Sequence, residues 1–126
     1  MTIKSTLIFL TLCFSSFILH SFLALKVINE DVSLLLCYIH LILFSWTCIH
    51  LFIISKTSKK KVIPVFLTLL ILKMLISGLV VYLLNKYLTL ETKIIIANFF
   101  VAYFFYLFLQ VFFSVKFLKK PNFAEN

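Results

Sequence analysis

Four long apolar runs constrain this chain more than any other feature of its sequence. They cover residues 5–25, 33–55, 62–84 and 94–115, and each is 21 to 23 residues long. A helix of about 20 residues crosses a bilayer core of ~30 Å. Hydrophobic residues make up 63% of the 126 residues and charged residues only 13%, far from the balance of a soluble domain. We therefore predict an all-α integral membrane protein whose four helices form an up-down bundle.

The connections between the runs predict one membrane domain over residues 1–126. They are seven, six and nine residues long, and connections of this length join antiparallel neighbours. Pro64 lies in the first turn of the third run, where a missing N–H is tolerated. The first run follows a lysine, as in a signal peptide, but it is longer than a typical h-region and no A-x-A-like site follows it. We therefore expect it to form the first membrane helix.

The lysines predict the orientation of the bundle. Eight of the twelve lie on the side of the two termini and the second connection: Lys4, Lys56, Lys59, Lys60, Lys61, Lys116, Lys119 and Lys120. The other side carries only Lys26, Lys86 and Lys93, together with Glu30, Asp31 and Glu91. The positive-inside rule then predicts two cytoplasmic termini in a bacterial cytoplasmic membrane. The basic loop of Lys56, Lys59, Lys60 and Lys61 either anchors this topology or touches anionic lipid or an acidic partner loop.

The third run carries one lysine, Lys73, with no charged residue within ten positions on either side. Because Lys73 is central in its run, it lies near the bilayer midplane. A lysine at this depth costs roughly 2.5–3.5 kcal/mol on insertion scales and usually faces a partner or a cavity. Its stem spans only ~6 Å, whereas either interface is about 15 Å away. We therefore expect Lys73 to be buried, with a partner or a function, rather than to reach water.

The candidate partners inside the chain are neutral, because no Asp or Glu lies within the four runs. Polar residues recur at spacings of three and four along the fourth run and so share one helical face: Tyr103, Tyr106, Gln110 and Ser114. Lys73 and Ser77 share a face of the third run. If these faces oppose each other, the Gln110 carbonyl meets the Lys73 amine. The alternatives are a deprotonated Lys73 or a carboxylate supplied by a partner subunit.

Most of the remaining polar residues lie on one broad arc of the second run: Cys37, His40, Thr47 and His50, with Trp46 beside them. His40 and His20 of the first run lie at similar depths in the outer half. Two histidines at one depth are able to ligate a haem iron. However, a chain with one glycine and bulky helices offers little room for a macrocycle. We expect the two histidines to be hydrogen-bonded inside the bundle or to lie near the headgroups, and we expect no cofactor.

Several function classes find no support in the sequence. The three cysteines form no C-x-x-C motif, and no phosphate loop, paired catalytic carboxylates or nucleophile–base pattern is present. We therefore expect a protein that is not an enzyme. The net charge of +8 is explained by the lysines that set the membrane orientation, and it does not indicate nucleic-acid binding. No G-x-x-x-G pattern predicts a close-packed dimer, so the oligomeric state stays open.

The size, the four helices, the basic middle loop and a midplane lysine in the third helix resemble the ATP synthase subunit I family. In that family the third helix carries a G-E-x-x-K-like pattern, and the fourth can carry a glutamine in an apolar run. Here "LLILKML" places Lys73 at the lysine position and "LFLQVFF" contains Gln110. The family's acidic residue, three positions before the lysine, is Leu70 in this chain, and its glycine is Leu69.

The resemblance implies an accessory role in assembling the membrane ring of c subunits of the F-type ATP synthase. A c subunit carries a membrane carboxylate near mid-depth, which would suit Lys73. A magnesium-supply role, also suggested for that family, depends on the acidic residue that is missing here. The alternatives are a small four-helix transporter, for which a lysine favours anions, and a structural subunit of another membrane complex.

Overall fold

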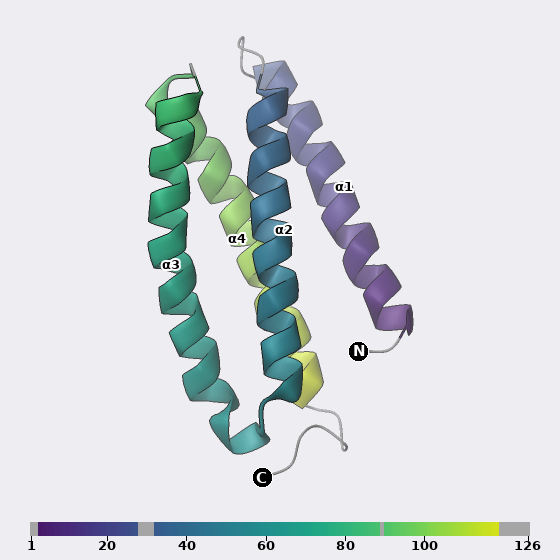
Figure 1. Cartoon of the computed structure of the whole chain (residues 1–126). Coiled ribbons are helices and arrows are strands. Elements are labelled where there is room, and N and C mark those ends of the chain that lie inside the picture. The colour runs from purple at the N-terminus through teal and green to yellow at the C-terminus, as the bar shows by residue number, and fades with distance from the viewer. Residues whose placement is uncertain (1–2, 28–31, 89, 119–126) are drawn as a thin grey trace.

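The computed structural model describes residues 3–27, 32–88 and 90–118, which form four long helices joined by short connections (Figure 1). The helices are α1 (Ile3–Val27), α2 (Ser33–Lys56), α3 (Val62–Tyr87) and α4 (Thr92–Leu118), and a 3₁₀ turn, η1 (Lys59–Lys61), precedes α3. The predicted all-α fold class is confirmed. Each helix continues up to three residues beyond the run predicted for it. The added residues include lysines, which are good helix formers and can extend their amines beyond an apolar surface.

All four helices are long and apolar enough to span a membrane, which makes the chain a multi-pass membrane protein by length and composition. The outer surfaces of the helices agree with this. Large apolar side chains such as Phe14, Met74 and Phe108 are each more than 60% exposed. Such a surface is unfavourable in water but suits contact with lipid chains.

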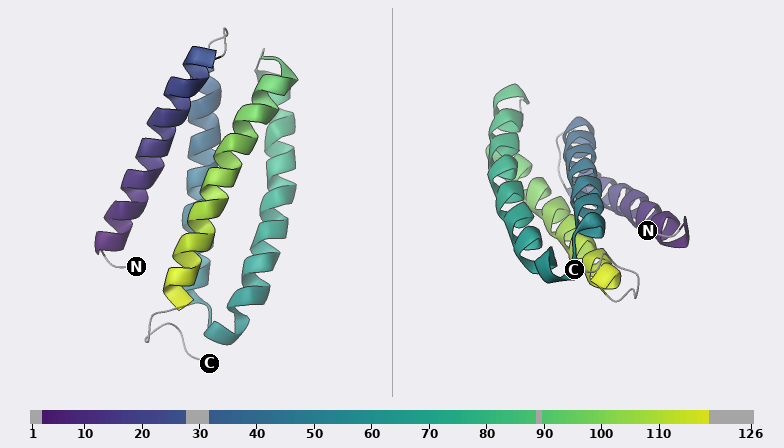
Figure 2. Two further views of the ribbon diagram at one scale, coloured as in Figure 1. Left: turned by 180° about the vertical axis from the view of Figure 1, so that it is seen from behind. Right: turned by 60° about the horizontal axis from the view of Figure 1, so that its bottom comes forward.

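The four helices do not contribute equally to the bundle. α2 and α4 pack most extensively against each other, and α1 and α3 pack against this central pair from opposite sides (Figure 2). α2 and α4 run in the same direction, because one crossing of the bundle by α3 separates them. Most of the buried positions therefore belong to α2 and α4, and these two helices supply the polar groups described below.

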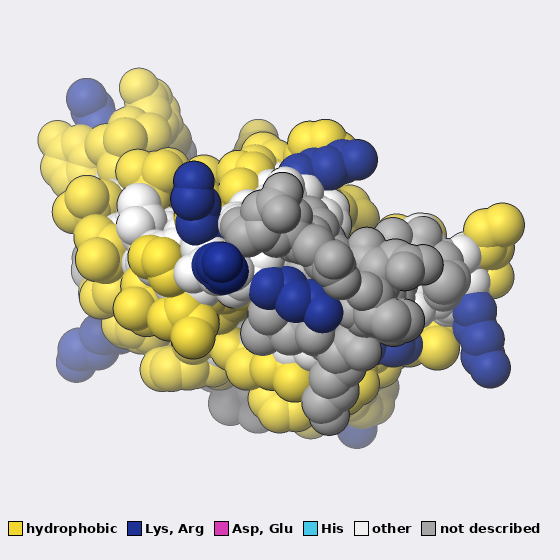
Figure 3. Space-filling view, turned by 90° about the horizontal axis from the view of Figure 1, so that it is seen from below, with side chains coloured by type: hydrophobic (Ala, Val, Ile, Leu, Met, Phe, Trp, Pro, Cys, Tyr) yellow, Lys and Arg dark blue, Asp and Glu magenta, His cyan; other side chains and the backbone are white. Residues whose placement is uncertain are grey.

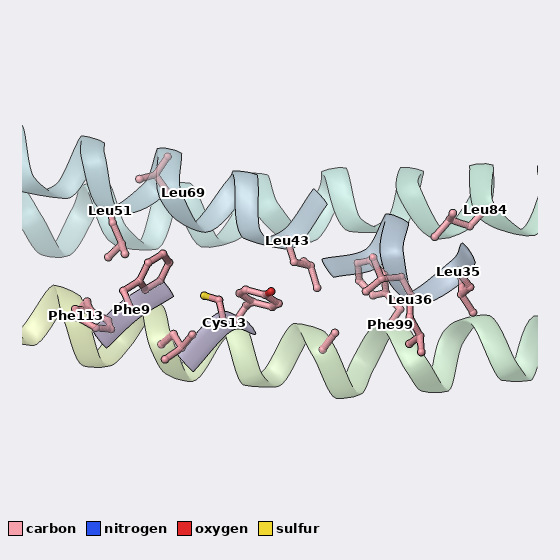
Figure 4. Close-up of a cluster of buried hydrophobic side chains, with 14 of the residues drawn as sticks. Phe9, Cys13, Leu35, Leu36, Leu43, Leu51, Leu69, Leu84, Phe99 and Phe113 are labelled. Carbon is pink, nitrogen blue, oxygen red and sulfur yellow. The ribbon is translucent and has the colours of Figure 1, made fainter. Parts of the chain in front are cut away.

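The core is a row of apolar side chains along the bundle axis (Figure 4). Leu35, Leu36 and Leu84 lie toward one end, and Leu51, Leu69 and Phe113 lie toward the other. Phe9 of α1 stacks on Phe44 with ring centroids 5.9 Å apart, and this contact fixes α1 against α2. Burying side chains of this size contributes on the order of 1.5–3 kcal/mol each in water, whereas in lipid close packing replaces that driving force.

One end of the bundle is basic. The beginning of α1, the end of α4 and η1 lie at the same end (Figure 1). Figure 3 shows lysine side chains spread around this face, and the described lysines there are Lys4, Lys56, Lys59, Lys60, Lys61 and Lys116. Lys119, Lys120, Glu30 and Asp31, which also enter the predicted charge difference, lie outside the described residues. The second connection shortens to Thr57 and Ser58, because the following three lysines form η1.

Candidate functional site

Lys73 is buried at the centre of the bundle, where its amine donates a hydrogen bond to Gln110. Its side chain is 2% exposed and that of Gln110 is fully buried. Lys73 Nζ lies 2.6 Å from Gln110 Oε1, a short distance that is typical of hydrogen bonds with a charged donor. The contact joins α3 to α4, as expected if the two polar faces oppose each other. The predicted pairing of Lys73 with Gln110 is therefore present.

The same glutamine extends the contact to α2. Gln110 Nε2 lies 2.7 Å from His50 Nδ1. Because Gln110 Oε1 accepts from the lysine, its amide nitrogen donates to His50, and a neutral His50 then carries its proton on Nε2. His50 Nε2 is buried and has no hydrogen-bond partner among the described residues. The Lys73–Gln110–His50 chain therefore links three helices and ends on an unpaired donor.

Aromatic rings complete the surroundings of these polar groups. The Tyr103 ring lies 4.8 Å from Lys73 Nζ, measured to its centroid, within range of a cation–π interaction. The Phe66 ring packs against His50 at 4.9 Å between centroids. Two buried hydroxyl residues are close in sequence to these polar groups: Thr47 lies three positions before His50, and Ser114 lies four positions after Gln110. Their hydroxyls have no hydrogen-bond partner among the described residues. An aromatic setting of this kind accommodates a cation without a carboxylate.

A groove between α2 and α3 leads from the surface of the bundle to Lys73. Its volume is ≈ 330 Å³, and most of its wall is apolar. The polar residues that line it are Ser45, Trp46, Lys73 and Ser77. The Trp46 indole N–H is buried and has no partner among the described residues. The groove therefore presents hydrogen-bond donors and one amine, and no acidic residue lines it, so its chemistry suits an anion.

A second polar cluster lies nearer the other end of the bundle and contains the two histidines singled out from the sequence. His20 Nδ1 and His40 Nε2 are 2.9 Å apart. His20 Nε2 lies 3.0 Å from Asn98 Oδ1, and His40 Nδ1 lies 3.2 Å from the Tyr106 hydroxyl. The expected hydrogen-bonded histidine pair is thus present inside the bundle, and it ties α1 to both central helices.

The donors in this cluster follow one order. Asn98 Nδ2 donates to the carbonyl of Ile94 at 2.8 Å, so its Oδ1 accepts from His20 Nε2. With both imidazoles neutral, His20 Nδ1 then accepts from His40 Nε2, and His40 Nδ1 accepts from the Tyr106 hydroxyl. Every ring nitrogen is therefore satisfied. This arrangement does not fit haem, because an iron with two axial histidines stands between the two nitrogens that here bond directly to each other.

The structure separates some residues that the sequence analysis grouped together. Tyr103 joins Lys73, whereas Tyr106 joins the histidine pair. Ser77 lines the groove that leads to Lys73. Cys37, placed on the polar arc of the second run, is exposed. The basic loop of Lys56, Lys59, Lys60 and Lys61 lies at the end of the bundle, away from both polar clusters.

Asn98 was missed from the sequence, and the pairing of His50 with Gln110 was not predicted, although His50 was placed on the polar arc of the second run. Asn98 lies eight positions before Tyr106 and continues the polar stripe of α4 toward its beginning, so extending the four-residue spacing would have found it. His50 is 17 residues from the start of α2 and Gln110 is 18 from the start of α4. Because these helices run in the same direction, the two residues lie at one depth.

A comparison with protein-family models, curated proteins and solved structures finds no significant match.

Proposed function

We propose that this protein is a non-enzymatic accessory subunit that binds a membrane helix of a partner protein through the groove between α2 and α3. The observation that carries the proposal is Lys73 itself. It is buried, and its hydrogen-bond partner, Gln110, is neutral. The only acidic residue in the described ranges 3–27, 32–88 and 90–118 is Glu91, which lies in the connection between α3 and α4. A partner carboxylate at mid-depth would supply the missing negative charge.

The groove supports this contact physically. Lys73 has three N–H donors, and one of them donates to Gln110. The Trp46 indole N–H has no hydrogen-bond partner among the described residues. A carboxylate accepts several hydrogen bonds, so these groups match it in number and in charge. An ion pair in hydrocarbon is strengthened by the low dielectric, provided that each charged group also has hydrogen bonds. Gln110 and Trp46 provide them here.

The partner that the resemblance implies is the c subunit of the F-type ATP synthase. Lys73 and Gln110, the two residues on which the resemblance to ATP synthase subunit I rests, lie on different helices and bond to each other, which is what a shared functional site would require. In this proposal the protein assists assembly of the c ring in the bacterial cytoplasmic membrane. Its basic end, where α1 begins and α4 ends, faces the cytoplasm according to the positive-inside rule.

Co-purification tests this function. Tagged protein is extracted from membranes in mild detergent, and recovered c subunits are measured for the parent, for Lys73→Leu and for Ser77→Phe. Both variants should lower recovery at least tenfold, the first because the cation is lost and the second because the ring fills the groove while Lys73 stays in place. Lys86→Leu, with the same charge change outside the groove, is the matched control and should bind as the parent does.

Two results would overturn the proposal. One is parent-like recovery of c subunits with Lys73→Leu. The other is normal c-ring assembly in cells from which the gene has been deleted. Circular dichroism and size-exclusion chromatography of each variant distinguish loss of the contact from loss of the fold. Should another membrane protein carrying a mid-depth carboxylate be recovered in place of c subunits, the contact chemistry stands and the ATP synthase assignment does not.

A transporter is the second candidate, and the buried polar stripe of α4 favours it. Asn98, Tyr106, Gln110 and Ser114 are all buried and follow one face of a helix that spans the membrane. With a lysine beside this stripe, the transported solute would be an anion. Uptake of small inorganic anions into liposomes that contain the purified protein tests this function, and Lys73→Leu should abolish any uptake that passes along the stripe.

A further inference from the structure

A second groove lies between α1 and α4, away from the groove that contains Lys73. Its volume is ≈ 550 Å³, within the range of small-molecule sites. Small side chains form part of its wall, from Ser16 and Ala24 on α1 and from Ala97 and Ala102 on α4. Because these residues leave room between two helices, the groove opens sideways, toward the lipid that surrounds a membrane helix.

The groove has the length of one membrane leaflet. Its lining residues on α4 extend from Lys93 to Phe105, and twelve residues of helix measure about 18 Å. Half of a hydrocarbon core of ~30 Å is about 15 Å. The groove therefore begins at the level of the headgroups and ends near the middle of the bilayer. An acyl chain lying along it would be covered on two sides by apolar wall.

Polar residues line the part of the groove nearest the start of α4. Lys93 stands at its rim and is exposed. Asn98 lines it five residues deeper, and its amide nitrogen uses one of two hydrogens on the carbonyl of Ile94. The oxygen of Asn98 is held by His20, so the orientation of the amide is set. Glu91 lies on the same end of the bundle but does not line the groove.

The geometry points to a binding site for an anionic phospholipid of the leaflet at the Lys93 end. The Lys93 ammonium binds the phosphate, because a lysine near the surface attracts anionic headgroups. The second amide hydrogen of Asn98 donates to a glycerol ester carbonyl, and the acyl chain follows the apolar wall toward Phe105. This site does not depend on the function proposed above, since it lies between other helices and uses none of the residues around Lys73.

A tryptophan placed in the groove tests the site without interference from the lysines at the opposite end. Trp46 is the only tryptophan of the chain, so Trp46→Phe gives a protein without tryptophan fluorescence. Val101→Trp then reports from the groove wall in liposomes of phosphatidylcholine to which phosphatidylglycerol with brominated chains is added. Brominated phosphatidylcholine is the comparison. We expect about fivefold tighter binding of the anionic lipid, the effect of one interfacial lysine.

The controls separate a site from diffuse attraction. Lys93→Gln should remove the preference for phosphatidylglycerol, whereas Lys86→Gln, at the same end but outside the groove, should keep it. Phe100→Trp, at nearly the same depth on another face of α4, should show no preference. If Val101→Trp does not fold, Leu23→Trp on the opposite rim replaces it. Equal quenching by the two lipids, or equal loss in Lys93→Gln and Lys86→Gln, overturns the proposal.

Discussion

Lys73 shows how a membrane helix can hold a basic side chain without a carboxylate in the same chain. Leaving an amine unpaired in hydrocarbon costs several kcal/mol. The side-chain carbonyl of Gln110 accepts a hydrogen bond from that amine at 2.6 Å. The ring of Tyr103, which is also on α4, lies beside the amine. The central position of Lys73 in its helix, and Gln110 as one candidate partner, could be read from the sequence. The third member, His50, could not, because its pairing depends on α2 and α4 being in direct contact.

Substitution of Gln110 measures the strength of this arrangement. Gln110→Leu should lower the free energy of unfolding by about 2 kcal/mol, because the buried amine loses its acceptor and His50 loses its donor. The double variant Lys73→Leu/Gln110→Leu should recover at least about 1 kcal/mol of that loss, because no amine is left unpaired. Unfolding by denaturing detergent, followed by circular dichroism, provides both values.

The matched control for this cycle is Tyr103→Phe, which keeps an aromatic face beside the amine and should change stability by less than about 0.5 kcal/mol. A Gln110→Leu protein as stable as the parent would contradict the structural role of the Lys73–Gln110 bond. So would a double variant that is no more stable than the single one.

At the scale of the helices, the sequence predicted how many there are but not how they share the core. Each run of apolar residues became a helix with ends within three residues of the expected positions. Large apolar residues occur on every side of all four runs, so hydrophobic periodicity does not show which face or which helix is buried. Contact between α2 and α4 decides this. It comes from side-chain packing between helices, which a pattern along one helix does not contain.

The histidine cluster connects α1 to the central pair of helices through polar contacts. His20 bonds to His40 on α2 and to Asn98 on α4. His20→Leu should therefore loosen α1 while α2 to α4 stay packed. Bonds of this kind contribute about 0.6–1.7 kcal/mol each in membrane proteins, so amide hydrogen exchange in α1 should accelerate roughly tenfold.

Mass spectrometry of peptides from detergent-solubilised protein locates the change. Thr11→Ala is the control within α1, because the Thr11 hydroxyl donates to the Leu7 carbonyl of its own helix, and it should leave exchange unaltered. Acceleration spread evenly over all four helices would contradict a role of His20 confined to α1. Unchanged exchange in α1 would contradict the tie itself.

At the scale of the whole molecule, the difference in charge between the two ends is the feature that sequence and structure share most directly. The lysines at the start of α1, at the end of α2, in η1 and at the end of α4 come together at one end. They do so because consecutive helices run in opposite directions, so the start of α1, the end of α2, the start of α3 and the end of α4 lie at the same end of the bundle (Figure 1). A count of lysines along the sequence therefore translates into a surface charge. The two grooves had no such counterpart in the sequence, because each is formed by residues of different helices.

Cysteine labelling tests the orientation that this charge difference predicts. Ser58→Cys places a thiol in the connection between α2 and η1, and Thr92→Cys places one at the start of α4, at the opposite end. In intact cells, a maleimide that does not cross membranes should label Thr92→Cys. It should label Ser58→Cys only after the cells are permeabilised. The native cysteines lie within α1 and α2, and the unaltered protein provides the background.

The lysines can then be tested as the cause of the orientation. Replacing Lys59, Lys60 and Lys61 with Gln leaves five lysines against three from the original eight, so a measurable fraction of molecules should insert in reverse and expose Ser58→Cys to the reagent. Replacing Lys86 and Lys93 with Gln widens the difference and should leave Ser58→Cys protected. Labelling of Ser58→Cys in intact cells before any lysine is changed would contradict the cytoplasmic placement of the basic end. If the triple replacement leaves Ser58→Cys fully protected, the other five lysines are sufficient to orient the bundle, and the special role of the loop is refuted.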